Sequence, residues 1–345
     1  MKGFGERGRP LSYGAGRRAL VAVLAIGIGL ALAPVAFQMF ERGPKGAQMM
    51  DEFEPFMTDA RLDGFQGHIR SIDAGVREAG GPIAVALEGR GAAARERFEE
   101  RFPGFATFGR DWPPIHADMT NLLDTIQANA GNYRAVAALP SFRLFPWFFV
   151  IPGVLVALLA IGALLAPRAR PSIRWLLVAL GIGLVLAPVA FQMFDRAPKG
   201  ARMMDAFATI QTREQVETMQ GYFATIAVGQ GSLRLEIVPA LERSGLSASE
   251  IATRFPDVDT LNGGWIEILN DLTPMIGAMS DNVDNYEAIK SLPPFGLFPW
   301  FFVVPGLLIV ALAVLPGRRG ARPAAHAAAA GSLTTSGTAR QGGAS

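Results

Sequence analysis

A repeated block organises this chain. It begins at Ala33 as APVAFQMFERGPKGAQMMDEF and returns at Ala187 as APVAFQMFDRAPKGARMMDAF, with four changes in 21 positions. A second block closes each copy, as NYRAVAALPSFRLFPWFFVIPG from Asn132 and as NYEAIKSLPPFGLFPWFFVVPG from Asn285. Because the two blocks mark both ends of a unit of about 130 residues, the chain is predicted to be a tandem duplication.

Four apolar stretches border these blocks, at residues 19–40, 144–165, 175–194 and 297–315. Each is close to the ~20 residues that a helix needs to cross ~30 Å of hydrocarbon, and none contains a charged residue. Ala31-Leu32-Ala33 imitates a signal-peptide cleavage site, but the matching stretch at 175–194 is internal, so the first stretch is expected to be retained. The prediction is an all-α membrane protein with four transmembrane helices.

The charge distribution predicts the topology. Basic residues gather in an amino-terminal arm (1–18), a short link (166–174) and a carboxyl-terminal tail (316–345), which the positive-inside rule assigns to the cytoplasm. Residues 41–143 hold 15 acids against 12 bases and residues 195–296 hold 14 against 8, so both segments are expected outside. Because each unit contains two spans, both copies have the same orientation in the membrane, which predicts a pseudo-twofold axis along the membrane normal. The tail is rich in Ala, Gly, Ser and Thr and is predicted to be disordered.

Both outer segments carry apolar residues at three- and four-residue steps, the pattern of long amphipathic helices. In the second copy this row is Trp265, Ile268, Leu272, Met275, Met279, Val283, Tyr286 and Ile289, and the first copy repeats it from Trp112 to Val136. A Met- and Phe-rich arm precedes it in each copy and is expected to fill a core or, alternatively, to form a groove for lipid tails or a partner helix. Ser247 and Glu250 predict a capping box. Each outer segment is therefore expected to form a small helical bundle.

No catalytic, cofactor-binding or metal-binding pattern is present, so the chain is predicted not to be an enzyme and to need no cofactor. His68 and His116 align with Tyr222 and Leu269 in the other copy, and His326 lies in the tail. The basic pI sums a basic inner side and an acidic outer side, which gives no reason to expect nucleic acid. The spans carry no acid or histidine, which disfavours ion-coupled transport.

Three sets of paired residues are candidate contact sites. Charged residues and tryptophans at the outer boundary could contact lipid headgroups or a partner, or be solvated ends: Arg42, Lys45, Trp147, Arg196, Lys199 and Trp300. Prolines inside the spans are candidate hinges or packing kinks: Pro34, Pro152, Pro188 and Pro305. Asparagines near the ends of the return helices could fix helix register or make a polar contact: Asn129, Asn132, Asn282 and Asn285.

These features favour a non-enzymatic, multi-pass protein of a bacterial plasma (inner) membrane with both termini in the cytoplasm. The 28 arginines against four lysines fit a GC-rich bacterial source. The first hypothesis is that the two outer domains bind a protein partner or a second copy of the chain, with membrane lipid around the spans. The alternative is a subunit that handles lipids or other hydrophobes, or a pore, with its path between the two halves of the chain.

Overall fold

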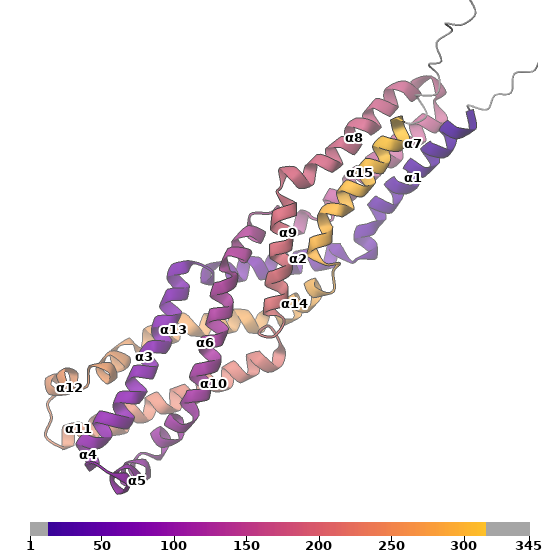
Figure 1. Cartoon of the computed structure of the whole chain (residues 1–345). Coiled ribbons are helices and arrows are strands. Elements are labelled where there is room, and N and C mark those ends of the chain that lie inside the picture. The colour runs from indigo at the N-terminus through magenta and orange to yellow at the C-terminus, as the bar shows by residue number, and fades with distance from the viewer. Residues whose placement is uncertain (1–12, 315–345) are drawn as a thin grey trace, which may run out of the picture.

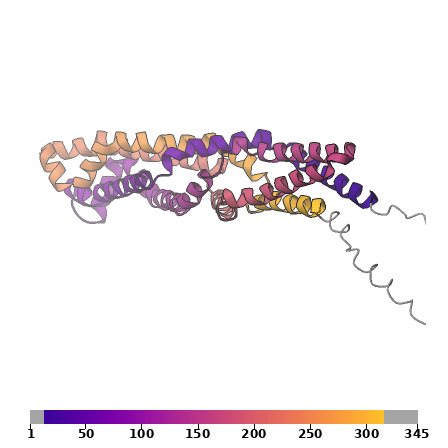
Figure 2. The same cartoon turned by 90° about the horizontal axis from the view of Figure 1, so that it is seen from above.

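The computed structural model describes residues 13–314, which form an elongated, helical molecule without β-strands in that range. Four apolar helices long enough to cross a membrane lie side by side at one end, and long polar helices form a bundle at the other (Figure 1). The view from above shows the same division along one long axis (Figure 2). The predicted all-α class and the four candidate spans are confirmed. Most of the amino-terminal arm and the whole tail at 316–345 lie outside the described residues.

The candidate spans are α1 (Tyr13–Ala36), α7 (Trp147–Leu165), α8 (Arg170–Ala190) and α15 (Phe298–Val314). Two glycine crossings hold them in pairs, as is common where membrane helices approach closely. A Cβ atom added at Gly27 on α1 would lie 2.9 Å from the carbonyl oxygen of Gly153 on α7, and one added at Gly181 on α8 would lie 2.9 Å from that of Gly306 on α15. The pairs α1/α7 and α8/α15 then meet along two seams, α1 against α15 and α7 against α8.

The first and third spans end four residues earlier than predicted, at Ala36 and Ala190 instead of positions 40 and 194. The physical reason is a backbone break. Gln38 and Gln192 have positive φ angles of 55° and 54°, in the left-handed region that interrupts a right-handed helix. New helices start at the next residue, α2 (Met39–Phe53) and α9 (Met193–Phe207). The predicted link at 166–174 is mostly helix, since η4 (Pro167–Ala169) leads directly into α8.

Residues 39–144 of the first half lie beyond the candidate spans and are called the outer part for that reason. They continue from α2 through short turns into two long helices. Its elements are η1 (Glu54–Phe56), α3 (Asp59–Glu78), the π-helical η2 (Ala79–Ile83), α4 (Ala84–Glu88), α5 (Ala92–Arg101), α6 (Pro103–Ala137) and η3 (Phe142–Leu144). The Thr58 side chain accepts the Arg61 N–H and caps α3, and Pro103 occupies the first turn of α6.

The outer part of the second half, residues 193–297, has a similar order of elements. It contains α10 (Arg213–Ser232), the π-helical η5 (Leu233–Ile237), α11 (Val238–Arg243), α12 (Ala248–Arg254), α13 (Pro256–Asp281), α14 (Val283–Lys290) and η6 (Phe295–Leu297). The predicted capping box is present, with the Ser247 hydroxyl accepting the Glu250 N–H and the Glu250 carboxylate accepting the Ser247 N–H. The return helix is broken at Asn282, whereas α6 is continuous.

The sequence suggested a separate bundle for each outer segment, but in the structure the two segments share one core. Helix α3 of the first half packs on α13 of the second, α10 packs on α6, α2 packs on α14, and α9 packs on α6. One hydrophobic cluster includes Phe65, Ile72 and Met119 from the first half with Met219 and Leu272 from the second. Each apolar stripe is thus buried largely against the other half.

Candidate functional site

Aromatic rings fill the level at which the spans meet the outer bundle. Phe149 on α7 and Phe302 on α15 lie with ring centroids 4.5 Å apart, and both are buried. Phe145 and Phe298 form an edge-to-face pair at 4.9 Å beside them. Such offset and edge-to-face arrangements are the favourable ones for aromatic pairs. These rings join α7 of the first half to α15 of the second half at this level.

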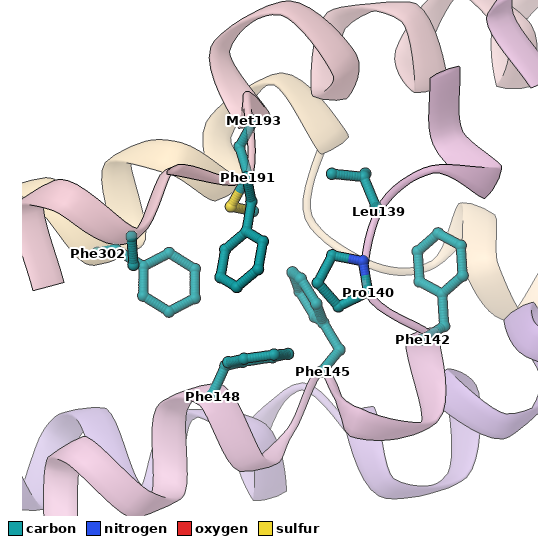
Figure 3. A pocket seen from close by; sticks show the side chains of 9 residues that line it. Leu139, Pro140, Phe142, Phe145, Phe148, Phe191, Met193 and Phe302 are labelled. Carbon is teal, nitrogen blue, oxygen red and sulfur yellow. The ribbon is translucent and has the colours of Figure 1, made fainter. Parts of the chain in front are cut away.

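A small cavity lies in the α7/α8 seam at this boundary. Its volume is about 30 Å³, and its lining is apolar. Figure 3 shows the rings of Phe145, Phe148, Phe191 and Phe302 pointing toward a common space, with Leu139, Pro140 and Phe142 on the outer side. Phe148 and Phe191, from α7 and from the turn after α8, form an edge-to-face pair at 5.8 Å across the seam.

A larger groove of about 310 Å³ lies in the other seam, between α1 and α15. Gly29 and Ala33 leave room on the α1 side, and Pro305 and Leu308 line the α15 side. Phe37 and Phe301, with ring centroids 6.3 Å apart, lie at its outer end, and Phe149 and Met39 also line it. The groove is nearly all apolar and its rim is open, since Gly29 and Leu308 are exposed. It lies along two segments long and apolar enough to span a membrane.

The charged residues predicted at the boundary connect the two halves. The Arg42 guanidinium donates to the carbonyl oxygen of Ser291 at 2.9 Å, and that of Arg196 donates to the carbonyl oxygen of Ala138 at 2.5 Å. Ser291 and Ala138 are the C-caps of α14 and α6, where free carbonyls attract a cation. These two arginines are therefore engaged in contacts between halves.

Lys45 and Lys199 each pair with an acid one turn earlier, Glu41 at 3.5 Å and Asp195 at 2.6 Å. Trp147 and Trp300 are half-exposed and make edge-to-face contacts with Phe40 and Phe194. They lie beside the aromatic layer without lining either cavity.

The four candidate asparagines form two matching local networks. Asn132 donates to the side-chain oxygen of Asn129, and Asn285 to that of Asn282, both at 2.9 Å. Asn282 also donates to the carboxylate of Glu52 on α2 in the first half. The structure thus contains the polar contact, and through Asn282 it joins α2 to the return helix of the other half.

The candidate hinge prolines occupy different surroundings. All four lie inside helices that continue through them. Pro34 and Pro188 are buried, Pro152 is half-buried, and Pro305 lines the groove. The groove wall also contains Leu30 and Phe301, the residues whose carbonyls lose their helical N–H donor to Pro34 and Pro305.

Several polar contacts between halves were missed from the sequence, and two of them lie at aligned positions. The Asp271 carboxylate on α13 contacts Arg61 at 2.8 Å and His68 at 2.9 Å, both on α3, and the hydrogen bond to His68 is the main reason that the pKa of Asp271 lies below its ordinary value. Asp118 on α6 accepts the Tyr222 hydroxyl at 2.5 Å, and this bond raises the pKa of Tyr222. Asp118 and Asp271 occupy aligned positions in the two copies, as do His68 and Tyr222. Each aspartate contacts the His or Tyr of the other half, so a comparison of these two aligned positions could have predicted the contacts.

Within residues 13–314, no three side chains of His, Cys, Asp or Glu are grouped as a metal site would require. The cavities at the candidate spans have almost wholly apolar linings. No family model, no curated protein and no solved structure matches the chain.

Proposed function

We propose that this chain is a non-enzymatic, four-span protein of a bacterial plasma membrane that binds the hydrocarbon chains of lipids in the α1/α15 groove. The observation that supports this proposal is the groove itself, with its volume of about 310 Å³, its almost wholly apolar lining and its open rim. Apolar clefts with few polar groups are typical small-molecule binding sites. A bilayer supplies acyl chains to any such space on a span.

The proposed architecture is a duplicated unit with a pseudo-twofold axis along the membrane normal. Paired features support it: the left-handed glutamines at 38 and 192, the crossings at Gly27 and Gly181, and π-helical turns at 79–83 and 233–237. Both termini are proposed to be cytoplasmic, with residues 41–143 and 195–296 outside.

The topology can be tested in a chain that contains no cysteine. Cysteine placed at Gln66 or Gln220 in the outer bundle is expected to react with a membrane-impermeant maleimide in intact spheroplasts. Cysteine at Arg168 in the link is expected to react only after lysis. Labelling of the two bundle positions only after lysis would contradict the proposed orientation.

Filling the groove tests lipid binding. Gly29→Leu places a side chain where a Cβ atom has no neighbour within 4 Å, and it is expected to reduce the lipid that remains bound after purification in mild detergent. Gly183→Leu is the matched control, because Gly183 aligns with Gly29, also has open space, and lines neither cavity described above. Native mass spectrometry gives the readout. Equal lipid retention by the two variants would reject the groove as a lipid site.

Binding of a protein partner, or self-assembly, is the second proposal and needs a different surface from the Met- and Phe-rich stripes. Those stripes contribute to cores shared by both halves, with Met50, Met119, Met203 and Met275 all buried. Exposed apolar side chains do occur on the outer helices of the second half: Val228 at 61%, Leu235 at 74% and Ile266 at 61%. If they mediate self-association, replacing all three by Ser should reduce crosslinked dimers in membranes. An unchanged dimer yield would remove these three side chains from consideration.

A further inference from the structure

The spaces in the two seams are lined in part by aligned side chains but differ in extent. Five residues of the α1/α15 groove align in the repeat with five residues of the α7/α8 cavity: Ala33, Phe37, Met39, Phe149 and Phe301 with Ala187, Phe191, Met193, Phe302 and Phe148. Each set contains a pair of phenylalanines across the seam, Phe37 with Phe301 and Phe148 with Phe191.

From that shared level the two spaces extend in opposite directions. The groove continues along the spans to Ile26, Pro305 and Leu308. The cavity continues outward to Leu139, Pro140 and Phe142, which lie between α6 and α7 (Figure 3). Each seam is thus open on one side of its phenylalanine pair, the α1/α15 seam toward the spans and the α7/α8 seam toward the outer bundle, at aligned positions.

We propose that the phenylalanine pair of each seam is a gate, and that one acyl chain of a membrane phospholipid passes it within that seam, from the side of the spans to the side of the outer bundle. This inference rests on the proposed lipid-binding function. A gate of this kind is closed by ring contact alone, because no charged side chain lines either space. An acyl chain fits these spaces because the groove opens on the exposed side of the candidate spans and both linings are almost wholly apolar.

An experiment in vesicles tests passage through the α7/α8 gate. Leu139→Cys supplies the only thiol in the chain and lies beyond the gate, on the outer side of the cavity. A long-chain alkyl maleimide dissolved in the bilayer reaches it by the proposed route, and a small water-soluble maleimide reports general exposure. Phe148→Ala and, separately, Phe191→Ala remove one ring of the pair from each side of the seam.

Each gate variant is expected to raise the rate of labelling by the bilayer reagent about two- to tenfold, the population shift that corresponds to loss of one aromatic contact. The rate with the water-soluble reagent should not change. Phe194→Ala is the control, since this ring packs on Trp300 beside the seam and lines neither space. It is expected to leave both rates as they are.

An unchanged rate in both gate variants, or an equal rise with both reagents, would overturn the gate. The first result means that the route does not pass the rings, and the second means that the fold has loosened. If either result is found and Gly29→Leu still loses lipid, the groove remains a binding site without a gate. Equal lipid retention by Gly29→Leu and Gly183→Leu would instead remove the lipid-binding proposal itself.

Discussion

Gln38 and Gln192 direct the chain from the spans into the outer bundle. Both have left-handed backbone conformations that glycine adopts freely and β-branched residues strongly avoid. Gln38→Gly is expected to leave thermal stability in detergent unchanged or slightly raised. Gln38→Val should destabilise by about 1–2 kcal/mol.

Gln48→Val is the control for this pair, because Gln48 is an exposed residue inside α2. It is expected to cost only the small helix-propensity difference. Equal losses for valine at 38 and at 48 would contradict the strained turn.

Glu78 is the buried acid that joins the halves at the far end of the bundle. It is 9% exposed, and its carboxylate accepts the N–H of Val258 in the first turn of α13 at 2.7 Å. Burial raises the pKa of Glu78; the Val258 N–H opposes this shift, and the Asp257 carboxylate adds to it. A raised folded-state pKa means that the related stabilisation is complete below the unfolded pKa and is lost as pH rises through the folded value.

Glu78→Gln cannot ionise and should therefore gain stability relative to the native chain as pH rises from about 4 to 8. Glu250→Gln is expected to behave oppositely, because the hydrogen bonds from Ser247 lower the pKa of Glu250. That variant should lose stability at neutral pH and match the native chain in acid. Melting curves across this range check both, and a pH-independent difference for Glu78→Gln would contradict the burial argument.

At the scale of the helices, the glycine crossings set how closely α1 and α7 approach. A Cβ atom at Gly153 would lie 2.5 Å from the backbone nitrogen of Ala31, so Gly153→Ala must push the helices apart. The expected loss is about 1–3 kcal/mol, typical of overpacking. Gly162→Ala, in the same helix, meets only the end of the Ile173 side chain at 3.6 Å and should be neutral or stabilising. Equal melting temperatures for these two variants would show that the crossing is not tight.

The helices themselves could be predicted from the sequence, because the spacing of Trp265, Leu272 and Met279 and the capping box at Ser247 are local signals. The early end of the first span could not be predicted, since glutamine gives no warning of a left-handed turn. The helix that packs on each apolar stripe could not be predicted either, because periodicity identifies the buried face of a helix but not the surface that covers it.

The candidate site was predictable only in part. The repeated FPWFF motif placed aromatic rings at the outer boundary, but the cavities depend on how the two seams pack. The alignment of His68 with Tyr222 argued only against a duplicated catalytic or metal site. Both nevertheless contact an aspartate of the other half, because imidazole and phenol can each form a hydrogen bond with a carboxylate.

At the scale of the whole molecule, helices of each half pack on helices of the other half. This packing forms one core in the outer bundle and two seams among the candidate spans. The outer apolar stripes are buried in that core, whereas the α1/α15 groove remains open at its rim. The apolar groove therefore lies among the candidate spans and not in the shared core.

The most direct measurement is photocrosslinking in vesicles with a phospholipid that carries a diazirine in its acyl chain, followed by mass-spectrometric mapping of the labelled residues. The account predicts more label on Leu30 in the groove, although it is 6% exposed, than on Leu32 and Leu186, which face outward at 57% and 56%. Label that follows exposure, with Leu32 and Leu186 above Leu30, would contradict a bound acyl chain in the groove.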